Sequence, residues 1–328
     1  MKNININELD APVILKDFLS YMQTIKGKSS GTIKEYYYDL RMFFRYLKLH
    51  FNLIPSDVEF DEIIISDFDE QLLKKINLSD LYAFLSFVSS SRHNSPNARA
   101  RKVASLKSFF KYIKNKANII NENPAQELES PKIIKRLPRY LNIDESKKLL
   151  SSIYGPYSKR DYAILALFLN CGLRLSELVS ININSIKDDK LVIIGKGGKE
   201  RTIYLNNACM KAIKQYMRER PVDGVKDKNA LFLSERKKRI STSMVQKLVK
   251  RYIMNAGLDP SKYSTHKLRH TAATLMYKHG KVDIRALQEI LGHQSISTTE
   301  IYTHLDDEQL RSAVQSNPLS TYSNSDDE

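Results

Sequence analysis

Six side chains in the C-terminal half of the sequence could do chemistry together. They are two arginines, a lysine, two histidines and a tyrosine: Arg174, Lys199, His266, Arg269, His293 and Tyr302. A tyrosine hydroxyl among guanidinium, ammonium and imidazole groups suits displacement at an anionic phosphodiester, because the negative charge that builds on phosphorus needs hydrogen-bond donors around it. These residue types therefore predict chemistry at a nucleic-acid phosphate, and we expect the rest of the chain to hold DNA.

The segment HKLRH places His266, Arg269 and His270 at spacings of three and four residues, which on a helix share one face. Taken alone, the pattern is also typical of an amphipathic surface helix. Two histidines at i and i+4 can chelate zinc, but Lys267 stands where the HExxH motif has glutamate, and no carboxylate lies near in sequence. We therefore expect neither a metal nor a cofactor.

The glycine turn GKGGKE carries Lys196 and Lys199 between two predicted strands. It lacks the spacing of a P-loop and the helix that follows one, so it does not predict a nucleotide site. What remains is a lysine at a hairpin tip. Such a lysine could enter a DNA groove and protonate a leaving oxygen, or it could simply be solvated.

The composition agrees with a polyanionic partner. The 328 residues carry 52 Lys+Arg against 37 Asp+Glu, a formal charge of +15, and binding to phosphates releases condensed counterions. The two cysteines, Cys171 and Cys209, form no disulfide framework, which fits a reducing cytoplasm. We find no signal-peptide pattern, and the longest apolar stretch, 163–173, is too short to cross a bilayer, so we expect a cytoplasmic protein without a membrane partner.

Helical spacing of apolar residues dominates up to about residue 123. It predicts helices near 14–25, 29–47, 79–88 and 95–113, and it leaves 57–68 open between loop and short strand. Pro124, Pro131 and Pro138 disfavour a continuous helix. We therefore expect a helical DNA-binding domain at 1–123 and a linker at 124–138.

The second domain is predicted at 139–316, followed by a disordered polar tail at 317–328. Helices are expected at 144–153 with Asp144 as cap, at 159–171 ended by Gly172, from near 207, and at 241–256, 266–279 and 283–291. Residues 191–194 and 201–205 should form a hairpin. Ser297 and Glu300 suggest a capping box that begins a helix containing Tyr302, and 306–314 suggests one more short helix. The fold class is thus mainly α with a small β-sheet.

Four segments resemble, in order and in spacing, the signature boxes of the tyrosine recombinases, most closely the Xer-type enzymes and related phage and transposon integrases. They are GLRLSELVSI, IGKGGKERTIYL, HKLRHTAAT and LQEILGHQSISTTEIYTH. The resemblance spans the second domain, and the helices at 32–46 and 95–110 are more loosely similar to the core-binding domain of the family. It implies a helical bundle and a catalytic α+β domain that together form a clamp around duplex DNA.

The resemblance also implies roles at the phosphate. Arg174 and Arg269 would clamp the scissile phosphate, and His293 would donate a hydrogen bond to a non-bridging oxygen. Glu177 matches an acid of the first box that lies behind the groups contacting the phosphate, and it could orient Arg174 three residues away.

The remaining implied roles concern the bonds that form and break. Tyr302 would be the nucleophile, His266 would exchange a proton with it, and Lys199 would be the general acid on the leaving 5′-hydroxyl. Attack would give a 3′-phosphotyrosyl link that keeps the free energy of the phosphodiester, so ATP and metal are unnecessary.

The partners implied are double-stranded DNA with an inverted-repeat site and further recombinase subunits in a tetrameric synapse, either copies of this chain or a paralogue. The biology could be chromosome-dimer resolution or the integration and excision of a mobile element. Two alternatives stay open: a type IB topoisomerase, and a non-catalytic DNA-binding regulator of the same fold. Seven basic residues are candidate backbone contacts to DNA, or else parts of solvated faces: Arg99, Arg101, Lys102, Lys237, Lys238, Arg239 and Lys262.

Overall fold

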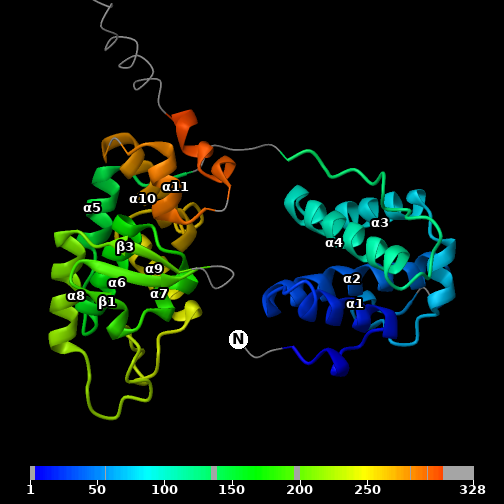
Figure 1. The fold of residues 1–328 in the computed structure, drawn as a ribbon, viewed down its shortest axis with the longest axis horizontal. Helices are drawn as coiled ribbons and strands as arrows, with labels where there is room; N and C mark the ends of the chain where they lie inside the picture. Colours follow the sequence, from blue (N-terminus) through cyan, green and yellow to red (C-terminus); the bar gives the residue numbers. More distant parts are fainter. Residues whose placement is uncertain are drawn as a thin grey trace, which may run out of the picture. The chain divides into compact units, whose positions relative to one another are not determined.

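The computed structural model describes residues 4–55, 57–133, 139–195, 200–280, 282–293 and 295–305. The chain forms two compact units, Met1–Lys135 and Arg136–Glu328, which are described one at a time (Figure 1). The division lies inside the segment predicted as a linker. However, Ala125 and Leu128 are buried in the core of the first unit, so the start of that segment is part of the folded unit.

The first unit is a helical bundle, as predicted. It contains α1 (Val13–Thr24), α2 (Ser30–His50), α3 (Leu78–Ser90) and α4 (Pro96–Asn115). The side chains of Ser29 and Ser95 accept hydrogen bonds from the first turns of α2 and α4, which is why these helices begin there. Segment 57–68, for which the sequence left loop and strand as alternatives, contains the short 3-10 turn η2 (Phe60–Glu62) and no strand among its described residues. Two similar turns are η1 (Ile6–Glu8) and η3 (Glu70–Lys75).

Aromatic rings fill the centre of this bundle. Phe43 meets Phe84 edge to face at 5.1 Å between ring centroids, and Phe44 meets Phe109 at 5.7 Å. These rings come from α2, α3 and α4, so their burial fixes the three helices against one another. The bundle therefore has its own hydrophobic core.

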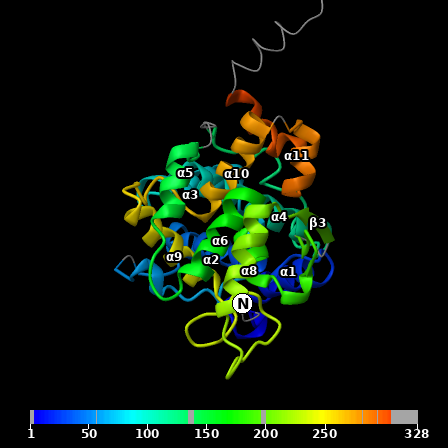
Figure 2. The ribbon, with the colours of Figure 1, turned by 90° about the vertical axis from the view of Figure 1, so that its left-hand side faces the viewer.

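The second unit contains seven helices in its described part. They are α5 (Ile143–Ser151), α6 (Ser158–Cys171), α7 (Leu175–Ser180), α8 (Asn207–Glu219), α9 (Thr242–Asn255), α10 (Thr265–Gly280) and α11 (Ile284–Leu291). Helix α6 has a continuous buried apolar stretch at 163–169 and packs against α8 and α10 (Figure 2). A three-stranded antiparallel sheet, β1 (Ile186–Lys187), β2 (Lys190–Ile194) and β3 (Glu200–Tyr204), has the order β1-β2-β3. The predicted class, mainly α with a small sheet, is confirmed.

Two glycines end helices next to the residues expected to do chemistry. Gly172 ends α6 with φ +59°, as predicted, and Gly292 ends α11 with φ +64°. A Cβ at Gly172 would lie 2.9 Å from Leu291 Cδ2, so this glycine also lets α11 approach the end of α6. The two helix ends therefore lie side by side.

Several local predictions were wrong. Asn142, not Asp144, caps α5, through a capping box with Glu145. The box expected at Ser297 and Glu300 does not form, because the chain there makes the 3-10 turns η5 (Ile296–Thr298) and η6 (Glu300–Leu305). The predicted helix 306–314 and the tail 317–328 lie outside the described residues. Within the described ranges, no helix is both long and apolar enough to cross a membrane.

Candidate active site

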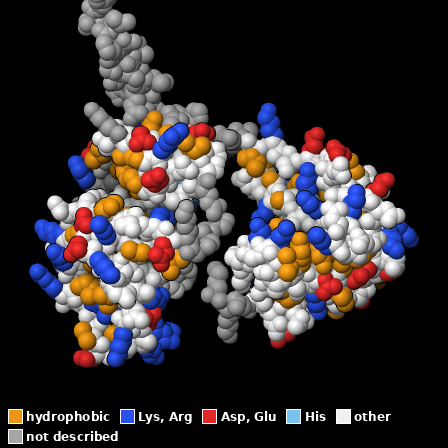
Figure 3. Space-filling model, viewed as in Figure 1, with side chains coloured by type: hydrophobic (Ala, Val, Ile, Leu, Met, Phe, Trp, Pro, Cys, Tyr) orange, Lys and Arg blue, Asp and Glu red, His pale blue; other side chains and the backbone are white. Residues whose placement is uncertain are grey.

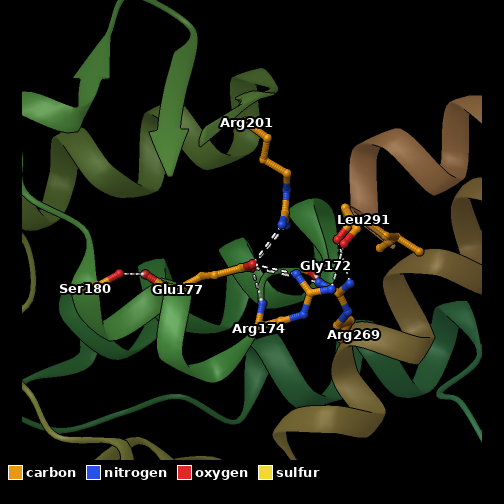
Figure 4. Close-up of polar contacts among 8 residues, drawn as sticks. Gly172, Arg174, Glu177, Ser180, Arg201, Arg269 and Leu291 are labelled. Atoms are coloured by element: carbon orange, nitrogen blue, oxygen red, sulfur yellow. Dashed lines mark hydrogen bonds and ion pairs between the residues drawn. The ribbon is translucent and has the colours of Figure 1, made fainter. Parts of the chain in front are cut away.

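A buried carboxylate, Glu177 in the first turn of α7, is the centre of the site (Figure 4). Arg174 Nη1 donates to its Oε1 at 2.8 Å, so the contact expected at i+3 is present, and the Arg174 backbone N–H donates to Oε2 at 2.8 Å. Arg201 on β3 donates to both oxygens, at 2.7 and 3.1 Å. Arg269 Nη1 lies 3.9 Å from Oε2. One carboxylate is therefore shared by three guanidinium groups.

These contacts keep Glu177 ionised. Burial alone would raise its pKa, but hydrogen bonds from the Arg174 backbone and from the Arg201 and Arg174 side chains hold the pKa below its ordinary value. Three guanidinium charges against one carboxylate leave a surplus of two positive charges at this place. Such a surplus favours an incoming anion such as a phosphate.

The two arginines expected to bind the phosphate are anchored at the helix ends described above. Arg269, on α10 and only 4% exposed, donates to the carbonyls of Gly172 at 2.6 Å and Leu291 at 2.7 Å. Arg174 donates to the carbonyl of Gly292 at 2.8 Å. Carbonyls at helix C-termini favour cations. Burial, followed by the charge of Arg174, lowers the pKa of Arg269 to about 10, and at neutral pH the group is still protonated.

Tyr302 lies in η6 and is 1% exposed. Its hydroxyl is 2.7 Å from Nδ1 of His270. Burial raises the pKa of Tyr302 to about 12, although Arg269 opposes this. Burial and then the neighbouring His266 lower the pKa of His270 to about 4. At neutral pH both groups are therefore uncharged, so the tyrosine donates and the imidazole accepts.

The two histidines expected at the site, His266 and His293, both lie close enough to His270 to lower its pKa. The ring of His266 is exposed and meets the His270 ring edge-on, with centroids 4.5 Å apart. His293 follows the end of α11, and its Nδ1 is 2.9 Å from the hydroxyl of Thr299. Burial and then Arg269 lower the pKa of His293 to about 4, so it is neutral at pH 7. The imidazole that accepts the hydrogen bond of the Tyr302 hydroxyl is therefore that of His270 and not that of His266.

Lys199 lies outside the described residues, and the structure does not place it. The described strand β3 begins at the next residue, Glu200, and its Arg201 contacts Glu177. Lys199 stays a prediction of the sequence.

Sequence reasoning missed two residues of this site, Arg201 and His270. His270 was noted only as sharing a face with His266, and the signal available was its four-residue spacing. The signal for Arg201 was weaker. It lies two residues after Lys199, in a segment for which the sequence predicted a role of the lysine alone. No group of three His, Cys, Asp or Glu side chains that could hold a metal ion occurs in the described part of the chain.

Three candidate DNA contacts lie in the first unit. Lys102 is 3% exposed, and its ammonium binds the buried Asp39 at 2.9 Å, so its assignment as a DNA contact was wrong. Arg101 is exposed and also binds Asp39, at 2.8 Å. Arg99 is half-buried and donates to Ser89 and to a backbone carbonyl.

The other four candidates lie in the second unit. Lys237, Lys238 and Lys262 are exposed, as a backbone contact to DNA requires. Arg239 binds Asp227 at 2.8 Å and two backbone carbonyls, so its guanidinium is used inside the unit. Figure 3 shows Lys and Arg side chains interspersed with acidic ones on the visible faces of both units.

Comparison with known proteins agrees with this geometry. The phage integrase family matches residues 139–309. A tyrosine recombinase XerC of Caldanaerobacter subterraneus subsp. tengcongensis is 61% identical over 95% of this chain and 88% of its own length. A tyrosine recombinase XerD of Proteus mirabilis is 32% identical over 93% and 92%.

Two solved structures share the fold. XerH site-specific recombinase bound to palindromic difH substrate has a TM-score of 0.69 at 24% identity, covering 94% of this chain and 97% of that one. A lambda integrase tetramer bound to a Holliday junction has a TM-score of 0.63 at 17% identity, covering 89% and 80%. The chain belongs to the phage integrase family. More specifically, it is a site-specific tyrosine recombinase, an enzyme that cuts and rejoins DNA.

Proposed function

We propose that Tyr302 is the nucleophile of this recombinase and that Arg174 and Arg269 bind the scissile phosphate. The tyrosine oxygen forms a bond to phosphorus, the bond to the 5′-oxygen breaks, and a 3′-phosphotyrosyl link remains. The observation that supports this most directly is the surplus of guanidinium charge around Glu177 together with the tyrosine on the adjoining η6 turn. The phosphodiester energy is retained in the link, so the reaction needs no nucleotide.

The described arginines can bind a phosphate without giving up their present partners. Each terminal nitrogen of a guanidinium carries two N–H groups, and those of Arg269 use one each on Gly172 and Leu291. Arg174 is the more accessible, with a side chain that is 33% exposed. Because Tyr302 is buried, binding of DNA must shift the η6 turn before attack can occur.

The remaining groups handle protons and orientation in this proposal. Lys199 protonates the leaving 5′-oxygen, and the neutral His293 donates a hydrogen bond to a non-bridging oxygen. The tyrosine proton leaves toward the imidazoles of α10, with His266 as the exposed member that exchanges it with solvent.

We further propose that the enzyme works in the cytoplasm on a DNA site with inverted repeats, as four subunits of which some can be a paralogous recombinase, with the two units of each chain forming a clamp around DNA. The XerH relative is bound to a palindromic substrate, and the lambda integrase relative is a tetramer on a Holliday junction. The formal charge of +15 fits such a partner. The Xer name of the relatives favours chromosome-dimer resolution over movement of an element.

The decisive experiment is Tyr302→Phe, which removes only the attacking oxygen. We expect the variant to lose the SDS-resistant DNA adduct while it still binds the site, because affinity for phosphate lies in the cationic groups. An adduct that persists in the Phe variant would show another nucleophile. An intact wild-type chain that forms no adduct on any site DNA would favour the non-catalytic regulator, and relaxation of supercoils without paired sites would favour the topoisomerase.

A further inference from the structure

We propose that Arg201 is a positioning residue for DNA cleavage, which holds Glu177 so that Arg174 and Arg269 keep their charge and direction for the phosphate. The inference rests on the proposed role of these two arginines. Nothing in the sequence boxes assigned a role to Arg201.

The first argument is the geometry at the carboxylate. Arg201 meets both oxygens of Glu177, at 2.7 and 3.1 Å, with a side chain that is 13% exposed. Bidentate pairing fixes the plane and the direction of the carboxylate as well as its distance. Glu177 then presents a fixed acceptor to Arg174 Nη1 at 2.8 Å. Arg174 is thereby oriented by a group that is itself held from the opposite side.

The second argument concerns charge. Without Arg201, the carboxylate would be shared by Arg174 and Arg269 alone. Glu177 would then be held by Arg174 alone and could pair more closely with Arg269, whose Nη1 is now 3.9 Å from its Oε2. A guanidinium that is neutralised by a close carboxylate is a weaker partner for a phosphate. Arg201 therefore supplies hydrogen bonds and positive charge to Glu177, so that this carboxylate does not compete with the phosphate for Arg174 and Arg269.

The third argument is the contact of Arg201 with the end of α11. A Cβ on Gly292 would lie 2.5 Å from Arg201 Nη1, so the guanidinium rests directly against the backbone of this glycine. The carbonyl of the same glycine binds Arg174 at 2.8 Å. One side chain thus joins β3 to α7 and to the end of α11, which His293 follows.

The test is a double-mutant cycle of Arg201→Gln and Glu177→Gln. It uses single-turnover adduct formation on site DNA, with DNA affinity measured separately. We expect Arg201→Gln to slow cleavage about 10- to 100-fold, the range for residues that orient a ligand, with little change in affinity. The double variant should be no slower than Glu177→Gln alone, because both changes remove the same support. Arg201→Lys should recover only part of the rate, since an ammonium lacks the planar pair of donors that matches the two oxygens of a carboxylate.

The matched control is Arg218→Gln, which removes one positive charge from an exposed position on α8 and should cleave normally. Thermal unfolding of each variant checks the fold, and Arg201→Lys, which keeps the charge, serves if Arg201→Gln does not fold. A wild-type rate in the Gln variant overturns the proposal. So does a double variant whose loss equals the product of the two single losses, because Arg201 would then contact the phosphate directly. Arg174→Ala is measured alongside, and a normal rate there would instead refute the proposed phosphate clamp.

Discussion

Replacing Glu177 by glutamine tests the central arrangement of the site, because it removes one negative charge and hardly changes the shape. The carboxylate now receives hydrogen bonds from the Arg174 side chain and backbone and from both terminal nitrogens of Arg201. A glutamine keeps one acceptor oxygen and turns an NH2 group toward one of these donors. Arg174, Arg201 and Arg269 would then lie together without a counter-charge.

The size of the loss follows from burial. Breaking a buried ion pair by removing one partner costs about 3 to 5 kcal/mol, because the other charge remains in the interior. Glu177 is buried and Arg269 nearly so, while Arg174 is partly exposed and relieves some of the repulsion. We therefore expect the lower end, about 3 kcal/mol of unfolding free energy.

The assay is urea unfolding of the full chain, followed by hydrogen exchange of α10 so that the transition of the second unit is measured separately from the first. Added sulfate should restore part of the stability, because the anion can replace the missing carboxylate among the guanidinium groups. The control is Glu219→Gln at an exposed position on α8. A loss below about 1 kcal/mol, the ordinary value for an exposed ion pair, would refute the reasoning.

Four further outcomes are expected. Arg269→Lys should slow adduct formation by about two to three orders of magnitude, since the ammonium of lysine cannot replace the two parallel N–H donors of a guanidinium; near-normal single-turnover rates would contradict this. Lys199→Ala should block cleavage of ordinary DNA but not of a substrate whose leaving oxygen is sulfur, which departs without a proton; equal defects on both would assign Lys199 another role. His270 and His293 have a pKa of about 4, below the ordinary 6.5, so protonation favours the unfolded chain. Their contribution to stability is complete above pH 6.5 and is lost as the pH falls through about 4, which melting temperatures at pH 7, 5.5 and 4.5 should show; a flat profile would contradict the shift. Lys102→Gln should lower the melting temperature without changing the salt dependence of DNA binding, because its ammonium is buried on Asp39, and a smaller salt slope would restore it as a DNA contact.

Local signals predicted most of the framework. Ser29, Ser95 and Gly172 begin or end helices for reasons that lie within three or four residues of each, and the structure confirms them. Helix α7 and strand β1 were not predicted, since six and two residues are too few to show a period. In place of the box expected at Ser297, the hydroxyl of this serine lies 2.8 Å from the hydroxyl of Ser295, a pairing that the sequence spacing does not reveal.

The candidate site likewise contains contacts that nearby sequence predicts and contacts that it does not. Arg174 and Glu177 meet because they lie three residues apart at the start of α7, whereas Arg269 reaches Gly172 from 97 residues along the chain. Arg201 joins them from 24 residues along the chain, through a hairpin whose docking depends on tertiary packing. His270 reaches Tyr302 across 32 residues. Lys102 was predicted as a DNA contact because it lies in a basic run, but its ammonium binds the buried Asp39, 63 residues away. Patterns within a segment cannot specify such pairings.

The two glycines at the helix ends have a consequence for how this enzyme can be altered. Each faces a side chain from another part of the site, Gly172 facing Leu291 and Gly292 facing Arg201, and both have positive φ. A larger residue at either position would have to be accompanied by a smaller one opposite it, and even then the backbone would remain strained. In a library selected for new DNA sites, substitutions at these positions should therefore survive rarely and in pairs. The exposed surfaces of both units are the parts that can vary one residue at a time.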